Sequence, residues 1–201
     1  MRRRLPAAAA AAIGIALAAS AVAQQPVRVR GTIAAVDGAM LTIKTREGSE
    51  VKAKLGDKTV VVAVVKASYD DIKPGSFIGV TGMPQADGSQ KCREIHIFPE
   101  AMRGTGEGFR PWDLEPKSTM TNATVDQMVT AKDGNTITLK YKDGEKKIVV
   151  GPDCPIVTYK PGDKTELKPG AKVFISAATK DSDGMLTFPR INVGRDAPPP
   201  M

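Results

Sequence analysis

The residues of this chain that could bind a metal ion gather near the middle of the sequence. His96 is the only histidine, and Met102 and Met120 follow it. Imidazole and thioether groups suit Cu(I), so these three residues are the candidate metal ligands, with copper as the candidate metal. Methionines also fill irregular gaps in hydrophobic cores, and that explanation of Met102 and Met120 stays open.

The position of His96 in its own segment predicts where its side chain points. It alternates with Ile95 and Ile97, and successive side chains of a strand point to opposite faces of a sheet. We therefore expect the isoleucines to face the core and His96 to lie on the polar side, at the surface or the rim.

Signatures of catalysis are nearly absent from the sequence. A serine nucleophile needs an adjacent base and an orienting acid, but no Gly-x-Ser-x-Gly segment presents a serine here. The run Gly104-x-Gly106-x-Gly108 lacks the following helix whose amide groups would bind a phosphate. We predict a protein that is not an enzyme and that binds no cofactor, with a copper ion as the alternative.

The segment around the glycine run contains the only tryptophan, Trp112. A large aromatic ring in a Gly/Pro-rich loop either packs the loop against a folded domain or anchors a protein partner. We expect Trp112, together with Arg103 and Arg110, to dock the linker or to contact such a partner. Single-stranded nucleic acid is not expected as a ligand, because stacking aromatic residues are few.

The two cysteines, Cys92 and Cys154, can pair in an oxidising compartment. They fall at non-equivalent points of the repeat described below, so a disulfide would join the two repeats. Two separate thiols are the alternative.

An internal duplication organises the chain. Asp37-Gly38 matches Asp133-Gly134, and Asp87-Gly88 matches Asp183-Gly184, both at a spacing of 96 residues. Lys73-Pro74-Gly75 matches Lys168-Pro169-Gly170 at 95 residues. Several anchors at one spacing predict two copies of a small domain.

Each copy has the pattern of short strands separated by turns. Period-two alternation and β-branched runs indicate strands, and Asp-Gly and Pro-Gly pairs indicate tight turns. The expected strands are 40–45, 59–65, 76–80 and 93–97 in the first copy and 136–141, 172–177 and 189–193 in the second. Only residues 67–72 suggest a short helical turn. Small all-β domains avoid long free edges by closing into barrels, so we predict an all-β protein of two tandem small OB-like barrels, with about six short strands each.

The predicted division of the chain follows from these patterns. Residues 1–23 have the arginine-rich start, the apolar stretch and the Ala-Val-Ala ending of a signal peptide cleaved after Ala23. Its removal lowers the formal charge from +7 to +4, because three arginines lie within it. Barrels are expected at 24–98 and 120–195, a Gly/Pro-rich linker at 99–119, and a disordered tail at 196–201. No later stretch is long and apolar enough to span a membrane.

The first repeat resembles a bacterial extracytoplasmic family described as domain of unknown function 5666. The resemblance covers most of residues 28–98 and is carried by four motifs: Gly31-Thr32-Ile33, Asp37-Gly38, Lys73-Pro74-Gly75 and Asp87-Gly88. The second copy has Asn122 where the opening glycine is expected. The segment 98–108, followed by Pro111-Trp112-Asp113, is similar to a linker in proteobacterial proteins with two such copies.

The resemblance implies a fold and a compartment but no activity. We therefore expect a periplasmic binding or scaffolding module with a protein partner. A periplasmic metal-binding protein is the alternative.

Overall fold

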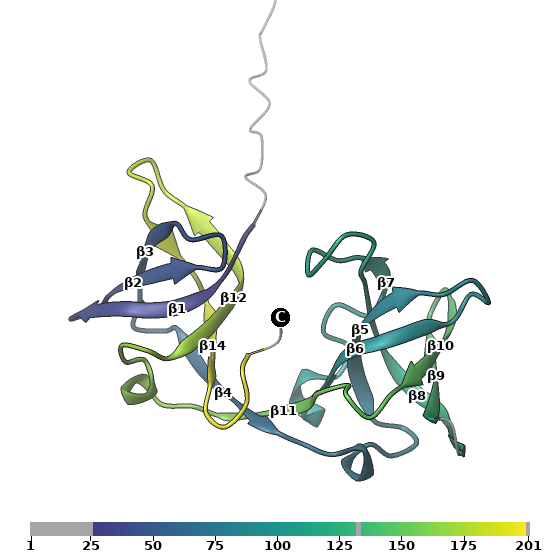
Figure 1. Cartoon of the computed structure of the whole chain (residues 1–201). Coiled ribbons are helices and arrows are strands. Elements are labelled where there is room, and N and C mark those ends of the chain that lie inside the picture. The colour runs from purple at the N-terminus through teal and green to yellow at the C-terminus, as the bar shows by residue number, and fades with distance from the viewer. Residues whose placement is uncertain (1–25, 132–133, 200–201) are drawn as a thin grey trace, which may run out of the picture.

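The computed structural model of the chain describes residues 26–131 and 134–199 (Figure 1). The predicted signal peptide and Asp133 lie outside the described residues. The described part is all-β, which confirms the predicted fold class. No helix in it is long and apolar enough to cross a membrane.

Strands make up most of the described chain, and three short 3-10 turns interrupt them. The strands are β1 (Val27–Asp37), β2 (Met40–Thr45), β3 (Glu50–Lys54), β4 (Val60–Lys66), β5 (Phe77–Pro84), β6 (Gln90–Ile97), β7 (Gly108–Pro111), β8 (Thr119–Ala131), β9 (Gly134–Tyr141), β10 (Gly144–Val150), β11 (Ile156–Pro161), β12 (Lys172–Lys180), β13 (Leu186–Thr187) and β14 (Arg190–Gly194). The 3-10 turns are η1 (Tyr69–Asp71), η2 (Glu100–Met102) and η3 (Lys164–Glu166). The expected helical turn at 67–72 corresponds to η1.

Five strands close into a barrel. β5 pairs with β6, β6 with β10, β10 with β9, β9 with β8, and β8 with β5 again. We call these five strands the closed barrel. The interior of the closed barrel holds one hydrophobic core, whose fully buried members include Ile78, Ile95, Ile137, Leu139 and Ile148.

A second ring of pairings involves β1, β2, β3, β13 and β12. Each strand pairs with the next, and β12 pairs with β1. We call these five strands the second ring. A separate core fills it, with Ile33, Leu41, Ile43, Ile175 and Ile191 among its buried members. Figure 1 shows the second ring on the left and the closed barrel on the right.

The two repeats exchange strands, which corrects the expected division into barrels at 24–98 and 120–195. The closed barrel takes β5 and β6 from the first repeat and β8 to β10 from the second. The second ring takes β1 to β3 from the first and β12 and β13 from the second. The physical reason lies in β4 and β11, which pair with each other along Val62–Lys66 and Val157–Pro161. Each of these strands runs straight from one ring to the other instead of turning back, as Figure 1 shows below the two rings.

The two rings share their register. Thr32 of β1 lies between Lys44 and Lys172, and Thr124 of β8 lies between Lys140 and Phe77. Each threonine is followed after one residue by a bulge in its strand. Because Thr124 is equivalent to Thr32, the residue equivalent to the opening Gly31 of the first repeat is Ala123 and not Asn122.

The expected linker and tail are both partly ordered. The linker segment 99–119 contains η2 and β7, and β7 pairs with β8. In the tail, Ala197 is buried, and the backbone amide of Lys66 donates to Asp196 at 2.7 Å. The prediction of a disordered tail is therefore wrong for residues 196–199, because β4 supplies a hydrogen-bond partner. Residues 200–201 lie outside the described part.

Candidate functional site: the groove beside the closed barrel

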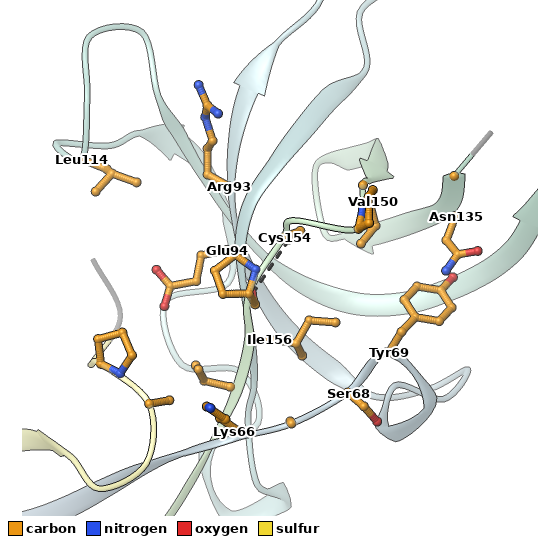
Figure 2. A pocket seen from close by; sticks show the side chains of 18 of the residues that line it. Lys66, Ser68, Tyr69, Arg93, Glu94, Leu114, Asn135, Val150, Cys154 and Ile156 are labelled. Carbon is orange, nitrogen blue, oxygen red and sulfur yellow. Dashed lines mark hydrogen bonds between the residues drawn. The ribbon is translucent and has the colours of Figure 1, made fainter.

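A groove of about 1290 Å³ lies beside the closed barrel, where the ends of β4 and β11, the linker and the residues after β14 meet it (Figure 2). Segments of both repeats line it: 66–69, 93–94, 114–115, 134–135, 150–157 and 197–198. Ligand sites are typically clefts of about 300–1,000 Å³ with mostly apolar walls and a few placed polar groups, and this groove is somewhat larger than that range. The groove is therefore the first place to look for a function.

A strand bulge opens the floor of the groove. β6 pairs with β10 as far as Lys91 and with β11 from Ile95 onwards. Between them, Arg93 is the extra residue of a bulge against β5. Bulges redirect side chains and end pairings, so this interval of β6 faces the groove instead of a neighbouring strand.

The disulfide between Cys92 and Cys154 fixes the same floor. It ties β6 to the loop before β11, and the two Cα atoms are 5.8 Å apart. The bridge joins the two repeats, as the sequence suggested, but both cysteines contact the core of the closed barrel. A covalent link at this point restricts the opening of the groove floor.

One wall of the groove offers a free hydrogen-bonding group. The Tyr69 hydroxyl is buried and has no hydrogen-bond partner among the described residues. Figure 2 shows it directed toward Asn135 across the groove. Burial raises the pKa of Tyr69, so the phenol stays protonated as a donor. An unpaired buried hydroxyl is unfavourable, and a bound molecule would satisfy it.

His96 is buried, which corrects the expected place at the surface or rim. It does point outward from the closed barrel, as its alternation predicted, but only 4% of it is exposed. The rings of Phe98 and Tyr159 cover it, with centroids 6.5 Å and 6.3 Å away. The sequence pattern could not show that β11 and the residues after β6 lie over this outer face.

Glu94 is the neighbour of His96 that the sequence analysis missed. Its Oε1 atom lies 3.4 Å from His96 Nε2, and Glu94 is only 4% exposed. The signal was present, since Glu94 and His96 stand two residues apart and must share a strand face. Glu94 also lines the groove, so the pair is reached from that side.

Other polar groups share the outer face around Gly79. Asn122 and His96 flank Gly79 across the strands, and Met120 and Glu94 flank Thr81 in the next row. The Thr81 Oγ1, Asn122 Oδ1 and His96 Nε2 atoms are buried and have no hydrogen-bond partner among the described residues. Buried polar atoms of this kind are commonly satisfied by ordered water or a ligand.

Met102 and Met120, the two predicted thioether ligands, lie in different surroundings. Met102 packs against the cluster of Val62, Val64 and Tyr159, and its sulfur accepts from Arg190 at 3.7 Å. Met120 is buried on β8 beside Thr81. Within the described residues no three His, Cys, Asp or Glu side chains form a metal-binding group.

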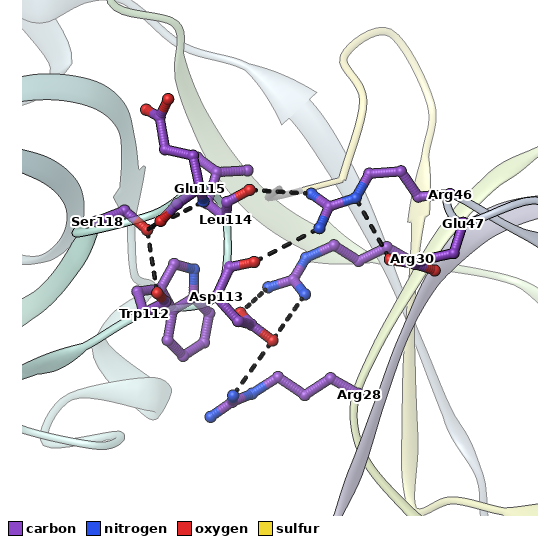
Figure 3. Close-up of polar contacts among 9 residues, drawn as sticks. All are labelled: Arg28, Arg30, Arg46, Glu47, Trp112, Asp113, Leu114, Glu115 and Ser118. Carbon is purple, nitrogen blue, oxygen red and sulfur yellow. Dashed lines mark hydrogen bonds and ion pairs between the residues drawn. The ribbon is translucent and has the colours of Figure 1, made fainter.

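Trp112, one of the three predicted docking residues, lies at the junction of the linker and the second ring (Figure 3). The guanidinium groups of Arg28, Arg30 and Arg110 lie 4.4, 5.5 and 5.7 Å from the ring centre of Trp112. Next to it, Asp113 accepts hydrogen bonds from Arg28 at 3.3 Å and Arg30 at 2.9 Å. Trp112 therefore packs the linker against β1 within this chain.

The two predicted arginines hold the linker itself. Arg103 pairs with Glu100 at 2.6 Å and donates to the carbonyl oxygen of Gly75. Arg110 donates to the carbonyl oxygen of Gly106 at 2.7 Å. Burial and the nearby charge of Arg28 lower the pKa of Arg110.

Comparison of the chain with protein-family models, with curated proteins and with solved structures finds no match.

Proposed function

We propose that this protein is an exported, non-catalytic periplasmic binding protein whose ligand lies in the groove beside the closed barrel. The observation that carries the proposal is the buried Tyr69 hydroxyl, which has no hydrogen-bond partner among residues 26–131 and 134–199 and belongs to a residue that lines the groove of about 1290 Å³. The leader-like residues 1–23 support export.

We also infer that each ring is an OB-like barrel. In both rings the first strand pairs with the second and with the strand after the crossover, and a parallel pair, β3 with β13 or β10 with β6, closes the circle. The shared register and the bulge in β1 and β8 support two copies of one fold. The last two strands of each ring, β12 and β13 or β5 and β6, come from the other repeat.

The experiment is a ligand-observed NMR screen of amphipathic small molecules against the mature protein. Ligands of the groove should bind the natural protein and bind about tenfold more weakly to Tyr69→Phe, which loses one buried hydrogen bond. Tyr141→Phe is the matched control, because Tyr141 does not line the groove. A screen whose ligands all tolerate Tyr69→Phe, or all lie elsewhere by chemical-shift mapping, would overturn the proposal.

Metal binding is the second candidate function, and the Glu94–His96 pair favours it. Metal bonds of about 2.1 Å to nitrogen and oxygen at a tetrahedral angle require about 3.4 Å between the two donor atoms. The Nε2 and Oε1 atoms are 3.4 Å apart. Glu94 thus joins His96 as a candidate ligand, while Met102 and Met120 remain the thioether candidates for Cu(I).

Native mass spectrometry with Cu(I), Zn(II) and Ca(II), each added separately, tests this candidate. A stoichiometric adduct should disappear in Glu94→Gln and His96→Gln and persist in Glu115→Gln, an acid at the same groove. Met102→Leu and Met120→Leu then show whether either sulfur contributes. The idea fails if no adduct forms, or if the Glu94 and His96 variants keep it.

A further inference from the structure

A regular group of cations covers the outer face of β2, β1 and β12 in the second ring. Lys44 and Lys172 flank Thr32 across these strands. In the next row, Arg30 pairs with Phe174, and the backbone amide of Arg46 donates to the carbonyl oxygen of Arg30. Because alternate residues of a strand share a face, these side chains lie together, away from the core.

These residues line a pocket of about 320 Å³, separate from the groove floor. Four of its described lining residues are cations: Arg30, Lys44, Arg46 and Lys172. No acidic side chain is among them. Pro198 and Pro199 form another side of the pocket, and Pro198 also lines the groove.

The acids near the pocket balance only part of this charge, and Glu50 of β3 is the cross-strand partner of Lys44. Asp113 forms ion pairs with both Arg28 and Arg30. The Oε1 atom of Glu47 lies 3.6 Å from Arg46 Nε. Lys44 and Lys172 form no ion pair within the described part of the chain. Arg30 is 9% exposed, and its buried Nε atom has no hydrogen-bond partner there.

The closed barrel provides an internal comparison. At the equivalent register positions, Thr124 lies between Lys140 and Phe77, so one of the two lysines is missing. Asn122 stands two residues before Thr124, where the second ring has Arg30 two residues before Thr32. Lys142 is the equivalent of Arg46, so the closed barrel keeps two of the four cations and lacks those equivalent to Arg30 and Lys172.

We infer that this pocket binds a phosphate-type oxyanion that carries an apolar portion. Lys44 and Lys172 attract such an anion as point charges. The terminal nitrogens of Arg30 already donate to Asp113, so this guanidinium contributes charge rather than a free pair of donors. Thr32 offers a hydroxyl between the lysines. The volume corresponds to about ten water molecules, which is more than a bare oxyanion fills, and Phe174, Pro198 and Pro199 form an apolar side. This site is independent of the groove ligand.

Calorimetry and vesicle binding on the mature protein test the inference at physiological ionic strength. The probes are inorganic phosphate, glycerol 3-phosphate, and phosphatidylcholine vesicles with and without phosphatidylglycerol. Binding of the soluble phosphoester identifies a soluble ligand, and binding only to the anionic vesicles identifies a lipid headgroup.

The double variant Lys44→Gln with Lys172→Gln should weaken binding of the responding probe about tenfold or more. Lys140→Gln with Lys142→Gln removes the same charge from the closed barrel and should change it by less than about twofold. Equal losses in the two double variants would reduce the effect to general charge attraction and overturn the inference. So would the absence of binding to every probe.

Discussion

At the residue scale, Gly79 decides how closely neighbouring side chains cover the outer face of the closed barrel. Gly79 separates Asn122 from His96 across the strands, and the ring of Phe98 lies over it. A β-carbon at Gly79 would lie 2.7 Å from Asn122 Oδ1 and 3.0 Å from Phe98 Cε2. The glycine is needed for this close approach and not for a turn.

Gly79→Ala should therefore destabilise the protein by about 1–3 kcal/mol, the usual cost of overpacking. Gly151→Ala is the control, since a β-carbon there would meet nothing within 4 Å. It should change the free energy of unfolding by less than about 1 kcal/mol. Urea unfolding measures both, and equal stabilities of the two variants would contradict the packing argument.

Asp113 gives the linker contact a pH dependence of known sign. Burial opposes ionisation of Asp113, but hydrogen bonds from Arg30 and the charges of Arg30 and Arg28 outweigh it and lower its pKa. A carboxylate with a lowered pKa in the folded state stabilises it above the ordinary value of 3.8. That contribution is lost as pH falls below this value toward the lowered one.

Asp113→Asn should lower stability at neutral pH by up to about 1 kcal/mol, because the pair is partly exposed. At about pH 2.5 the variant and the natural protein should approach each other. Urea unfolding at both pH values checks this, with the exposed Asp57→Asn as control. A difference that grows as the pH falls would show that the sign is wrong.

At the element scale, β4 and β11 hold the two rings in their exchanged arrangement. Val64 and Tyr159 face each other near the middle of this pair. The ring of Tyr159 stacks on Phe98 with centroids 5.5 Å apart. It also packs against Val62 and Val64 in a small hydrophobic cluster outside the two ring cores. Burial, together with the charge of Glu94, raises the pKa of Tyr159, so its phenol stays neutral at physiological pH.

Tyr159→Ala should cost about 3–5 kcal/mol of stability, as for other buried aromatic residues. Tyr159→Phe keeps the ring and should cost less than about 1.5 kcal/mol. Thermal unfolding of the two variants separates ring packing from hydroxyl bonding. A loss in Tyr159→Phe as large as in Tyr159→Ala would assign the role to the hydroxyl.

At the scale of the whole molecule, the exchange means that neither repeat contains a complete ring. A protease site inserted between Gly104 and Thr105 would cut the chain in an exposed turn between the repeats. After cleavage and reduction of the Cys92–Cys154 bridge, the two fragments should still elute together in native buffer. Each fragment supplies strands to both cores.

Size-exclusion chromatography checks this, with the uncleaved reduced protein as control. Two separate folded species would show that each repeat can close its own barrel. A denaturant midpoint lower than that of the uncleaved protein is expected, because the two fragments lose the connection that keeps them at high effective concentration.

The sequence alone determined seven of the strands in the described part of the chain, because alternation and turn residues act over a few positions. It did not give ranges for the long first strands of the rings, β1 and β8, or for the crossing strand β11. The expected strand at 40–45 is β2, and those at 59–65, 93–97 and 189–193 differ from β4, β6 and β14 by at most a few residues. Asp-Gly and Pro-Gly pairs marked the turns, and Gly38 and Gly75 have the positive φ that such turns require. The all-β class followed from these local signals.

Only the tertiary structure decided which strands pair. The two repeats carry the same register, so β5 and β6 bury the same faces against β8 to β10 as they would against β1 to β3. Hydrophobic pattern does not distinguish these partners. The straight antiparallel pairing of β4 with β11 selects the exchange, and the exchange creates the groove, buries His96 beside Glu94 and brings Arg30 beneath the linker. Each of these results depends on contacts between segments far apart in the chain, which local alternation does not encode.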